Sequence, residues 1–194
     1  MKRKKPLIIP ETEQLEREVK RQRYRHRYQN VLKSTVYTLI TVAAIAILVA
    51  TLWLPVLQIY GSSMTPTLSD GQIVFTVKTS DFEKGDVIAF YYNNKILVKR
   101  VIAVQGEWVN IDPDGTVYVN DQKLEEPYVA EKAYGDSNIT YPYQVPDGRI
   151  FVMGDHRSTS VDSRNTAVGC VAQEQIVGKI IFCIWPVEDI GLVR

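Results

Sequence analysis

The stretch VYTLITVAAIAILVATLWLPVL, residues 36–57, divides this chain of 194 residues into three parts. It lies in a longer segment, Ser34 through Ser69, that contains no charged side chain. About 20 apolar residues cross a hydrocarbon core of about 30 Å, so the stretch predicts a single transmembrane helix over residues 34–57. A buried core helix and a cleaved secretory signal are the competing interpretations. The 33 residues before Ser34 are too long a leader for such a signal.

The charges are distributed unevenly on the two sides of the apolar stretch. Residues 1–33 contain eleven Lys or Arg and four Glu, whereas the rest of the chain contains twelve basic and eighteen acidic residues. Because positively charged flanks stay in the cytoplasm, we expect a basic cytoplasmic segment over residues 1–33 and an extracytoplasmic domain over residues 58–194. The localisation is then a cell membrane, with one pass. Anionic lipid in the bilayer suits the basic segment better than nucleic acid does as a partner.

The outer domain is predicted to be mostly β. Short runs of Val, Ile, Tyr and Phe recur between turn signals, as is typical of strands. The sequence Asp-Pro-Asp-Gly at 112–115 predicts a turn between two such runs, and therefore a hairpin. The stretch from Glu125 to Gly148 is polar, rich in Tyr and interrupted by Pro, which indicates an irregular excursion. The predicted strands are residues 73–77, 86–92, 96–104, 108–111, 116–120, 150–153 and 178–185.

Two serines follow the apolar stretch closely, in Gly61-Ser62-Ser63-Met64-Thr65-Pro66-Thr67-Leu68. A small residue beside a serine lets a backbone N–H approach a reacting carbonyl, and Pro66 stiffens the turn. The pattern is compatible with a catalytic nucleophile and also with a plain polar spacer. It does not distinguish Ser62 from Ser63.

Lys99 is a candidate base. In the predicted strand 96–104, alternation puts Lys99 on one face with Leu97 and Val101, while Arg100 points the other way. One interpretation is an ordinary lysine whose stem packs on the domain while its ammonium reaches water. The other is a buried lysine, because burial lowers a lysine pKa by about 3–5 units from about 10.4. A neutral amine can then take the proton of a serine hydroxyl.

A third polar cluster, residues 154–164 (GDHRSTSVDSR), follows the predicted strand 150–153. Polar loops on rigid strands often carry functional sites, and a solvated loop with local ion pairs is the alternative. His156 is the only histidine after the apolar stretch, so a triad of Ser63, His156 and an aspartate is a second mechanism to consider.

Taken in order, these residues resemble the series of motifs in type I signal peptidases of the S26 family. The resemblance covers roughly residues 35–190. It implies a mostly antiparallel β-sheet catalytic domain behind one N-terminal transmembrane helix, with an inserted β-ribbon region at about residues 107–148. The matching motifs are Ser63-Met64-x-Pro66-Thr67-Leu68, Lys84-Gly85-Asp86-Val87, Val98-Lys99-Arg100-Val101, Gly154-Asp155, Ser160-x-Asp162-Ser163-Arg164, Gly178-Lys179-Ile180 and Trp185-Pro186.

The resemblance implies a catalytic role for two residues. Ser63 matches the nucleophile of the family, and Lys99 matches the general base. The Ser63 backbone N–H would form the oxyanion hole, with Gly61 where some relatives carry an additional serine hydroxyl. The source of a second oxyanion donor is therefore open.

The resemblance also implies a supporting loop, formed by Gly154, Asp155, Ser160, Asp162 and Arg164. Ser160 matches the hydroxyl that orients the lysine ammonium, and Asp162 and Arg164 match a buried pair. Three positions depart from the family pattern. His156 stands where asparagine is usual, and Ser158-Thr159 replace an acidic residue and an amide.

The implied activity is that of signal peptidase I, a serine endopeptidase that removes N-terminal signal peptides from exported preproteins at the outer membrane surface. An extended substrate segment would lie beside a strand edge. Shallow pockets for alanine-sized side chains would be lined by Ile59, Tyr60, Met64 and Val101. No metal or organic cofactor is expected, and the sequence does not indicate an oligomer.

Cys170 and Cys183 are the only cysteines. An exported domain could join them as a disulfide, but their strand-like surroundings favour two buried thiols. A cysteine transpeptidase of the sortase kind, using Cys170 and His156, is a rival enzyme class. A repressor-type self-cleaving protease would bring a DNA-binding module instead of an anchor, and a substrate-holding domain with an inactive dyad is the alternative outside enzymes.

Overall fold

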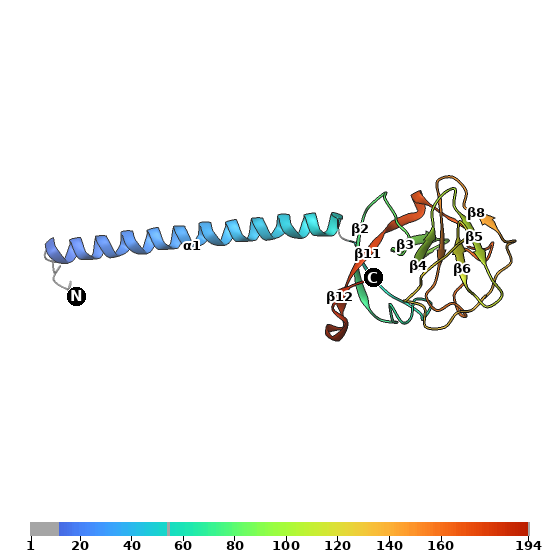
Figure 1. Ribbon diagram of the computed structural model, residues 1–194. Coiled ribbons are helices and arrows are strands. Elements are labelled where there is room, and N and C mark those ends of the chain that lie inside the picture. Colours follow the sequence, from blue (N-terminus) through green and yellow to red (C-terminus); the bar gives the residue numbers. More distant parts are fainter. Residues whose placement is uncertain (1–11, 54, 194) are drawn as a thin grey trace, which may run out of the picture. The chain divides into compact units, whose positions relative to one another are not determined.

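The structure is a computed structural model that describes residues 12–53 and 55–193. The chain divides into two compact units, with the boundary between Val49 and Ala50. Helix α1, Thr12–Trp53, accounts for the described part of the first unit and runs without a break through 42 residues (Figure 1). At about 1.5 Å per residue it is about 60 Å long, roughly twice the thickness of a hydrocarbon core.

The apolar part of α1 is not covered by protein. Every described side chain from Thr12 to Val49 is exposed, including Leu39 and Ile47. Within the described residues, α1 is the one helix long and apolar enough to cross a membrane. It ends earlier than the predicted boundary at residue 57, because Pro55 lacks an N–H donor and disfavours helical backbone before it.

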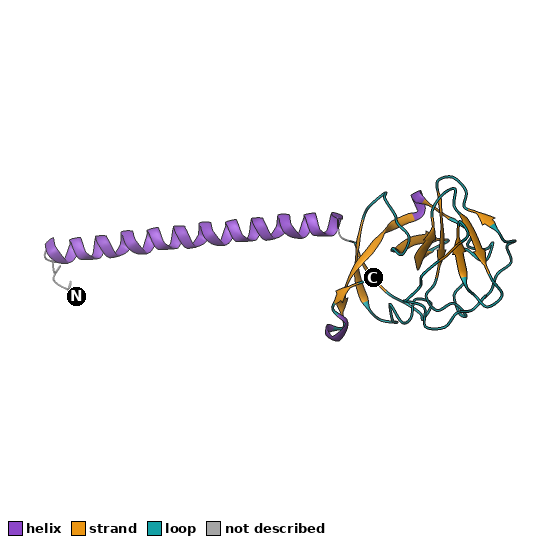
Figure 2. Cartoon of the chain, in the orientation of Figure 1, coloured by secondary structure: helices purple, strands orange, loops and turns teal. Residues whose placement is uncertain are grey.

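The second unit is a mostly antiparallel β domain, as predicted (Figure 2). Its larger sheet has the strand order β1-β2-β11-β3-β4-β9-β10, and β12 pairs with β11. Each predicted strand overlaps an observed one. The strands of this sheet are β1 (Val56–Gln58), β2 (Ile73–Val77), β3 (Val87–Tyr92), β4 (Lys95–Ala103), β9 (Arg149–Met153), β10 (Val171–Ala172), β11 (Ile176–Trp185) and β12 (Gly191–Leu192). Two short 3₁₀ helices, η1 (Gln173–Gln175) and η2 (Val187–Asp189), flank β11.

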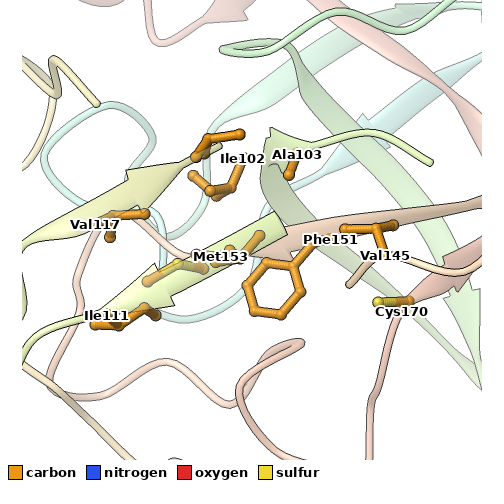
Figure 3. Packing of buried hydrophobic residues seen from close by; sticks show 10 residues of the cluster. Ile102, Ala103, Ile111, Val117, Val145, Phe151, Met153 and Cys170 are labelled. Atoms are coloured by element: carbon orange, nitrogen blue, oxygen red, sulfur yellow. The ribbon is translucent and has the colours of Figure 1, made fainter. Parts of the chain in front are cut away.

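A smaller sheet, with the order β7-β6-β5-β8, lies within residues 107–148. Its strands are β5 (Trp108–Ile111), β6 (Val117–Val119), β7 (Gln122–Lys123) and β8 (Tyr143–Gln144). β5 and β6 form the antiparallel hairpin around the turn at 112–115. Both sheets contribute to one core cluster, in which Ile111 and Val117 pack with Ile102, Phe151 and Met153 of the larger sheet (Figure 3). The smaller sheet is therefore joined to the larger one by a shared core.

The sequence pattern of each strand follows its place in the sheet. In β2, burial alternates along IVFTV, because one face is covered and the other is half open. In β3, by contrast, Val87 through Phe90 are all buried, since this central strand is covered on both faces. The uninterrupted apolar run of β3 is what such a position requires.

Strand β4 lies between β3 and β9, but β9 pairs with only part of its length. β3 pairs with it from Lys95 to Arg100, whereas β9 pairs only with Arg100 to Ala103. Among the described residues, no strand pairs with Lys95–Lys99 on the side where β9 lies. β4 therefore has an open edge, and this edge ends at Lys99.

Candidate active site

Ser63 lies in the loop between β1 and β2, and its neighbours hold that loop against the domain. Met64 and Leu68 are buried in a core cluster with Val74 and Val87, and the Leu68 N–H donates to the Met64 carbonyl at 2.9 Å. Buried anchors directly after Ser63 leave the serine itself half-exposed at a fixed position.

The side chain of Lys99, from β4, reaches Ser63. Its Nζ lies 2.8 Å from the Ser63 Oγ and donates a second hydrogen bond to the Val98 carbonyl at 3.0 Å. Lys99 contacts Ser63 and not Ser62, which is exposed. The fold therefore brings together the two predicted residues, 36 positions apart in the chain.

Burial sets the electrostatics of Lys99, which is only 3% exposed. Loss of hydration lowers the pKa of its amine, the nearby carboxylates of Asp162 and Asp155 raise it, and Arg164 lowers it. Desolvation is the largest of these effects, because within the described residues no carboxylate forms an ion pair with the Nζ. An amine in such surroundings loses its proton more readily and, once neutral, can accept the hydroxyl proton of Ser63.

The backbone N–H of Ser63 is a free donor. Among the described residues, the Ser63 N–H makes no hydrogen bond within the protein. The Gly61 N–H, by contrast, already donates to Asp70 Oδ1 at 2.6 Å. The Ser63 amide is thus available to a developing oxyanion, whereas the Gly61 amide is occupied.

Asp162 is the centre of the loop that follows β9. It accepts hydrogen bonds from the Gly154 N–H at 2.9 Å and from the Ser160 Oγ at 2.7 Å. The Arg164 guanidinium binds both of its carboxylate oxygens, each at 2.9 Å. Asp162 and Arg164 are both fully buried, so this pair fixes the loop behind Ser63.

Two details of this loop differ from or add to the sequence-based picture. Ser160, expected to orient the lysine, makes no hydrogen bond to Lys99 and instead donates to Asp162. Its hydroxyl also lies against Gly154, where a Cβ would collide with the Ser160 side chain and with the Ser63 carbonyl. Only glycine therefore lets this loop approach the Ser63 backbone so closely.

Asp155 pairs with a residue that the sequence analysis did not identify. The Arg100 Nε and Nη2 donate to its two carboxylate oxygens at 2.9 and 2.7 Å, and both side chains are 1% exposed. The Thr67 Oγ1 donates to Asp155 Oδ2 at 2.5 Å, and Tyr128 stacks on the Arg100 guanidinium at 3.9 Å. The pair thus ties β4 to the Ser63 loop and to the loop after β9.

A second missed pair joins Arg157 to Glu126. The Arg157 Nη1 donates to Glu126 Oε2 at 3.1 Å, and Nη2 contacts Oε1. The Arg157 Nε also donates to the Gly154 carbonyl at 3.2 Å. Glu126 lies in the segment predicted to be irregular, where no periodic signal could single it out.

His156 contacts the loop of Ser63 but not the Ser63 hydroxyl. Its backbone N–H donates to the Ser63 carbonyl at 3.1 Å, and its ring Nδ1 lies 3.1 Å from the Thr65 Oγ1. The geometry therefore does not assemble a triad through His156.

A groove of about 790 Å³ runs between the open edge of β4 and the segment that enters the Ser63 loop. Ile59, Tyr60 and Met64 line it, as expected from the sequence. Val101, predicted to line the same groove, is instead fully buried in another core cluster with Ile88. The lining is Leu57, Gln58, Ile59, Tyr60, Gly61, Ser63, Met64, Asn94, Lys95, Ile96, Leu97, Val98 and Lys99.

The two cysteines belong to different core clusters and are not bonded to each other. Both thiols are free and buried, Cys170 in the cluster shared by the two sheets and Cys183 in the cluster that anchors Met64. Burial raises the pKa of the Cys170 thiol. This is the arrangement of two buried thiols that the sequence favoured over a disulfide.

Comparison with known proteins points to one family. The family described as "Signal peptidase, peptidase S26" matches residues 32–185. A signal peptidase I of Bacillus licheniformis is 33% identical over 178 residues, covering 84% of this chain and 93% of the relative. A signal peptidase IB of Staphylococcus aureus is 41% identical over 152 residues, covering 68% and 78%. Among solved structures, a signal peptidase I from Enterococcus faecalis V583 is 32% identical, with a TM-score of 0.45, and covers 51% of this chain and 96% of that chain.

Proposed function

Because the chain belongs to the signal peptidase family, peptidase S26, we propose that it is a membrane-anchored serine endopeptidase that removes signal peptides from exported preproteins. The observation that carries the mechanism is the 2.8 Å contact between the Ser63 Oγ and the Nζ of Lys99, a side chain that is only 3% exposed. Lys99 is the general base in this proposal, and Ser63 is the nucleophile.

The reaction proceeds in two halves. Neutral Lys99 takes the proton of Ser63 as the Oγ bonds to the scissile carbonyl carbon, and the Ser63 N–H stabilises the oxyanion. The Lys99 ammonium then gives its proton to the leaving amine as the C–N bond breaks. Water then attacks the resulting ester while Lys99 accepts a proton from it. The C–Oγ bond breaks, Lys99 returns that proton to the Ser63 Oγ, and the signal peptide leaves with a free carboxylate.

Substrate binding uses the groove beside β4. An extended segment of the preprotein adds to the open edge at Lys95–Lys99 and takes up its unpaired main-chain groups. Side chains before the scissile bond face a lining that includes Ile59, Met64 and Val98, with Tyr60 exposed beside them. An apolar lining of this kind selects small uncharged side chains near the cut.

The supporting loop has a structural part in this proposal. Asp162 and Arg164 fix its backbone, and Asp155 joins it to β4 through Arg100. Ser160 and Gly154 pack directly behind the Ser63 carbonyl. Together they hold the nucleophile at one distance from the lysine amine.

The same proposal gives the chain a topology. Its apolar helix anchors it in the cell membrane with one pass, residues 1–33 in the cytoplasm and the domain from residue 58 outside. The basic residues before the apolar stretch and the acidic surplus after it support this orientation. Ser63 follows the apolar stretch closely in the sequence, so the anchor keeps the nucleophile near the bilayer surface, where a signal peptide ends.

The experiment is cleavage of a preprotein with alanines before its cut site by the purified full-length chain in detergent. We expect one cut in the wild type and a loss of at least about a hundredfold in Ser63→Ala and Lys99→Arg. Arginine keeps charge and bulk but cannot act as a base. Ser62→Ala is the matched control and retains cleavage. Undiminished cleavage by Lys99→Arg would refute the assigned base.

A further inference from the structure

A second hollow lies beside the two residues that follow Met64 in the Ser63 loop. It has a volume of about 200 Å³. Its lining is Thr65, Pro66, Ala130, Glu131, Asp155 and His156. The groove is lined by residues up to Met64 of the Ser63 loop, and this hollow by the next two residues, so the two cavities follow one another along that loop.

His156 connects the hollow directly to the nucleophile. Its N–H donates to the Ser63 carbonyl, and its ring contacts Thr65, each at 3.1 Å. A polypeptide whose residues before the cut fill the groove must continue past Ser63.

The charge of the hollow comes from one residue. Asp155 is neutralised by its ion pair with Arg100. Glu131 is exposed and, within the described part of the chain, makes no hydrogen bond or ion pair. The adjacent Lys132 does not balance it, because its Nζ donates to the Thr116 Oγ1 at 3.1 Å and its charge acts on Asp114.

We propose that this hollow binds the first residue after the scissile bond, and that Glu131 makes it favour a basic side chain over an acidic one. The inference rests on the proposed function, since it needs Ser63 to cut a polypeptide that passes through both cavities. Glu131 acts here as a specificity residue with no part in the chemistry. Its carboxylate attracts a lysine or arginine at this position and repels an aspartate or glutamate.

The test uses two preproteins that differ only at the first residue after the cut, Lys in one and Glu in the other. Both compete for the full-length enzyme in one reaction, so product ratios give the ratio of their kcat/KM values. Exposed ion pairs change such ratios by about 1.4- to 5-fold, and we expect about threefold in favour of Lys. The preference falls with added salt, because exposed charges are screened.

Two variants test whether the preference comes from Glu131 or from any carboxylate in this segment. Glu131→Gln is expected to bring the Lys-to-Glu ratio to about one, with little change for a substrate carrying Gln at that position. Glu125→Gln removes another exposed carboxylate nearby in the sequence that does not line the hollow, and it keeps the wild-type ratio. A ratio that is unchanged in Glu131→Gln would overturn the subsite and leave the peptidase intact. If the wild type cuts neither substrate, the proposed function fails, and the subsite fails with it.

Discussion

Lys99 and Arg100 are neighbours in β4 and both are buried, but only Arg100 forms an ion pair with a carboxylate, that of Asp155. Arg100 is held by an ion pair, whereas burial lowers the pKa of the Lys99 amine. Arg100 joins three segments, whereas the amine of Lys99 contacts a hydroxyl and a carbonyl. β4 thus carries both the proposed base and the arginine that holds the surrounding segments together.

The first prediction concerns the pH dependence of cleavage. Burial lowers the Lys99 pKa below its ordinary 10.5, and the base must be neutral to act. We therefore expect kcat/KM to rise with pH as the ammonium loses its proton, with a midpoint below pH 10.5. Initial rates between about pH 6 and 10 measure this. A midpoint at the ordinary lysine value would contradict the assignment.

The second prediction concerns the stability cost of the buried amine. The folded-state pKa of Lys99 is lowered, so below it the folded protein carries a desolvated charge that the unfolded chain hydrates freely. Stability rises between this lowered pKa and 10.5, where only the unfolded state still binds the proton. Lys99→Met should therefore stabilise the full-length chain at neutral pH, by about 0.5–2 kcal/mol.

Thermal unfolding in detergent measures this effect. The gain in Lys99→Met should shrink as the pH rises from the lowered pKa towards 10.5, because the wild type gains stability over this interval, where only its unfolded state binds the proton. Lys123→Met, at an exposed position of β7, is the control and should change stability by no more than about 0.5 kcal/mol at any pH. A lower melting temperature for Lys99→Met throughout would show that burial of the amine costs nothing.

The third prediction concerns the buried pair behind Ser63. Asp162→Asn leaves the Arg164 guanidinium without its counter-ion at a fully buried position. Breaking one side of such a pair costs about 3–5 kcal/mol. Urea unfolding of the full-length chain should show this loss, with less than about 0.5 kcal/mol for the exposed control Asp147→Asn. Equal stability of the two variants would mean that the pair does not hold the loop.

The fourth prediction concerns the thiols. Cys170 and Cys183 are 5% and 4% exposed, so both are shielded from reagents in the folded protein, and burial also raises the pKa of the Cys170 thiol. Alkylation of the native enzyme should leave both unlabelled by mass spectrometry and leave cleavage unchanged, while both react in urea. Labelling of Cys170 with parallel loss of activity would instead favour the transpeptidase interpretation.

The main features of the fold could be predicted from local pattern. An uncharged run of the right length indicates the helix, and period-two runs between turns indicate strands such as β2 and β4. The contact of Ser63 with Lys99 was accessible only through the order of motifs, because nothing local links residues so far apart in the chain. The predicted helix end at residue 57 was wrong, because the apolar run continues past Pro55 whereas the helix does not.

The errors around the site share one physical cause. Alternation predicts that Arg100 lies on the face opposite Lys99, but it cannot show that the Arg100 side chain is buried against Thr67 and Asp155. The same limit applies to Val101, which alternation assigns to the face of Lys99 but not to a particular cavity. The partner of Ser160 depends on the loop conformation around Asp162, for which the sequence has no periodic signal.

The open edge of β4 has a consequence for the breadth of substrates. Hydrogen bonds to a strand edge are made by peptide groups, which are the same in every protein. Recognition of this kind does not depend on most of the substrate's sequence. Only the few substrate side chains that contact the groove next to the cut site can distinguish one substrate from another. One enzyme can therefore mature many unrelated proteins, and a peptide-like inhibitor that mimics the shared backbone would compete with all of them.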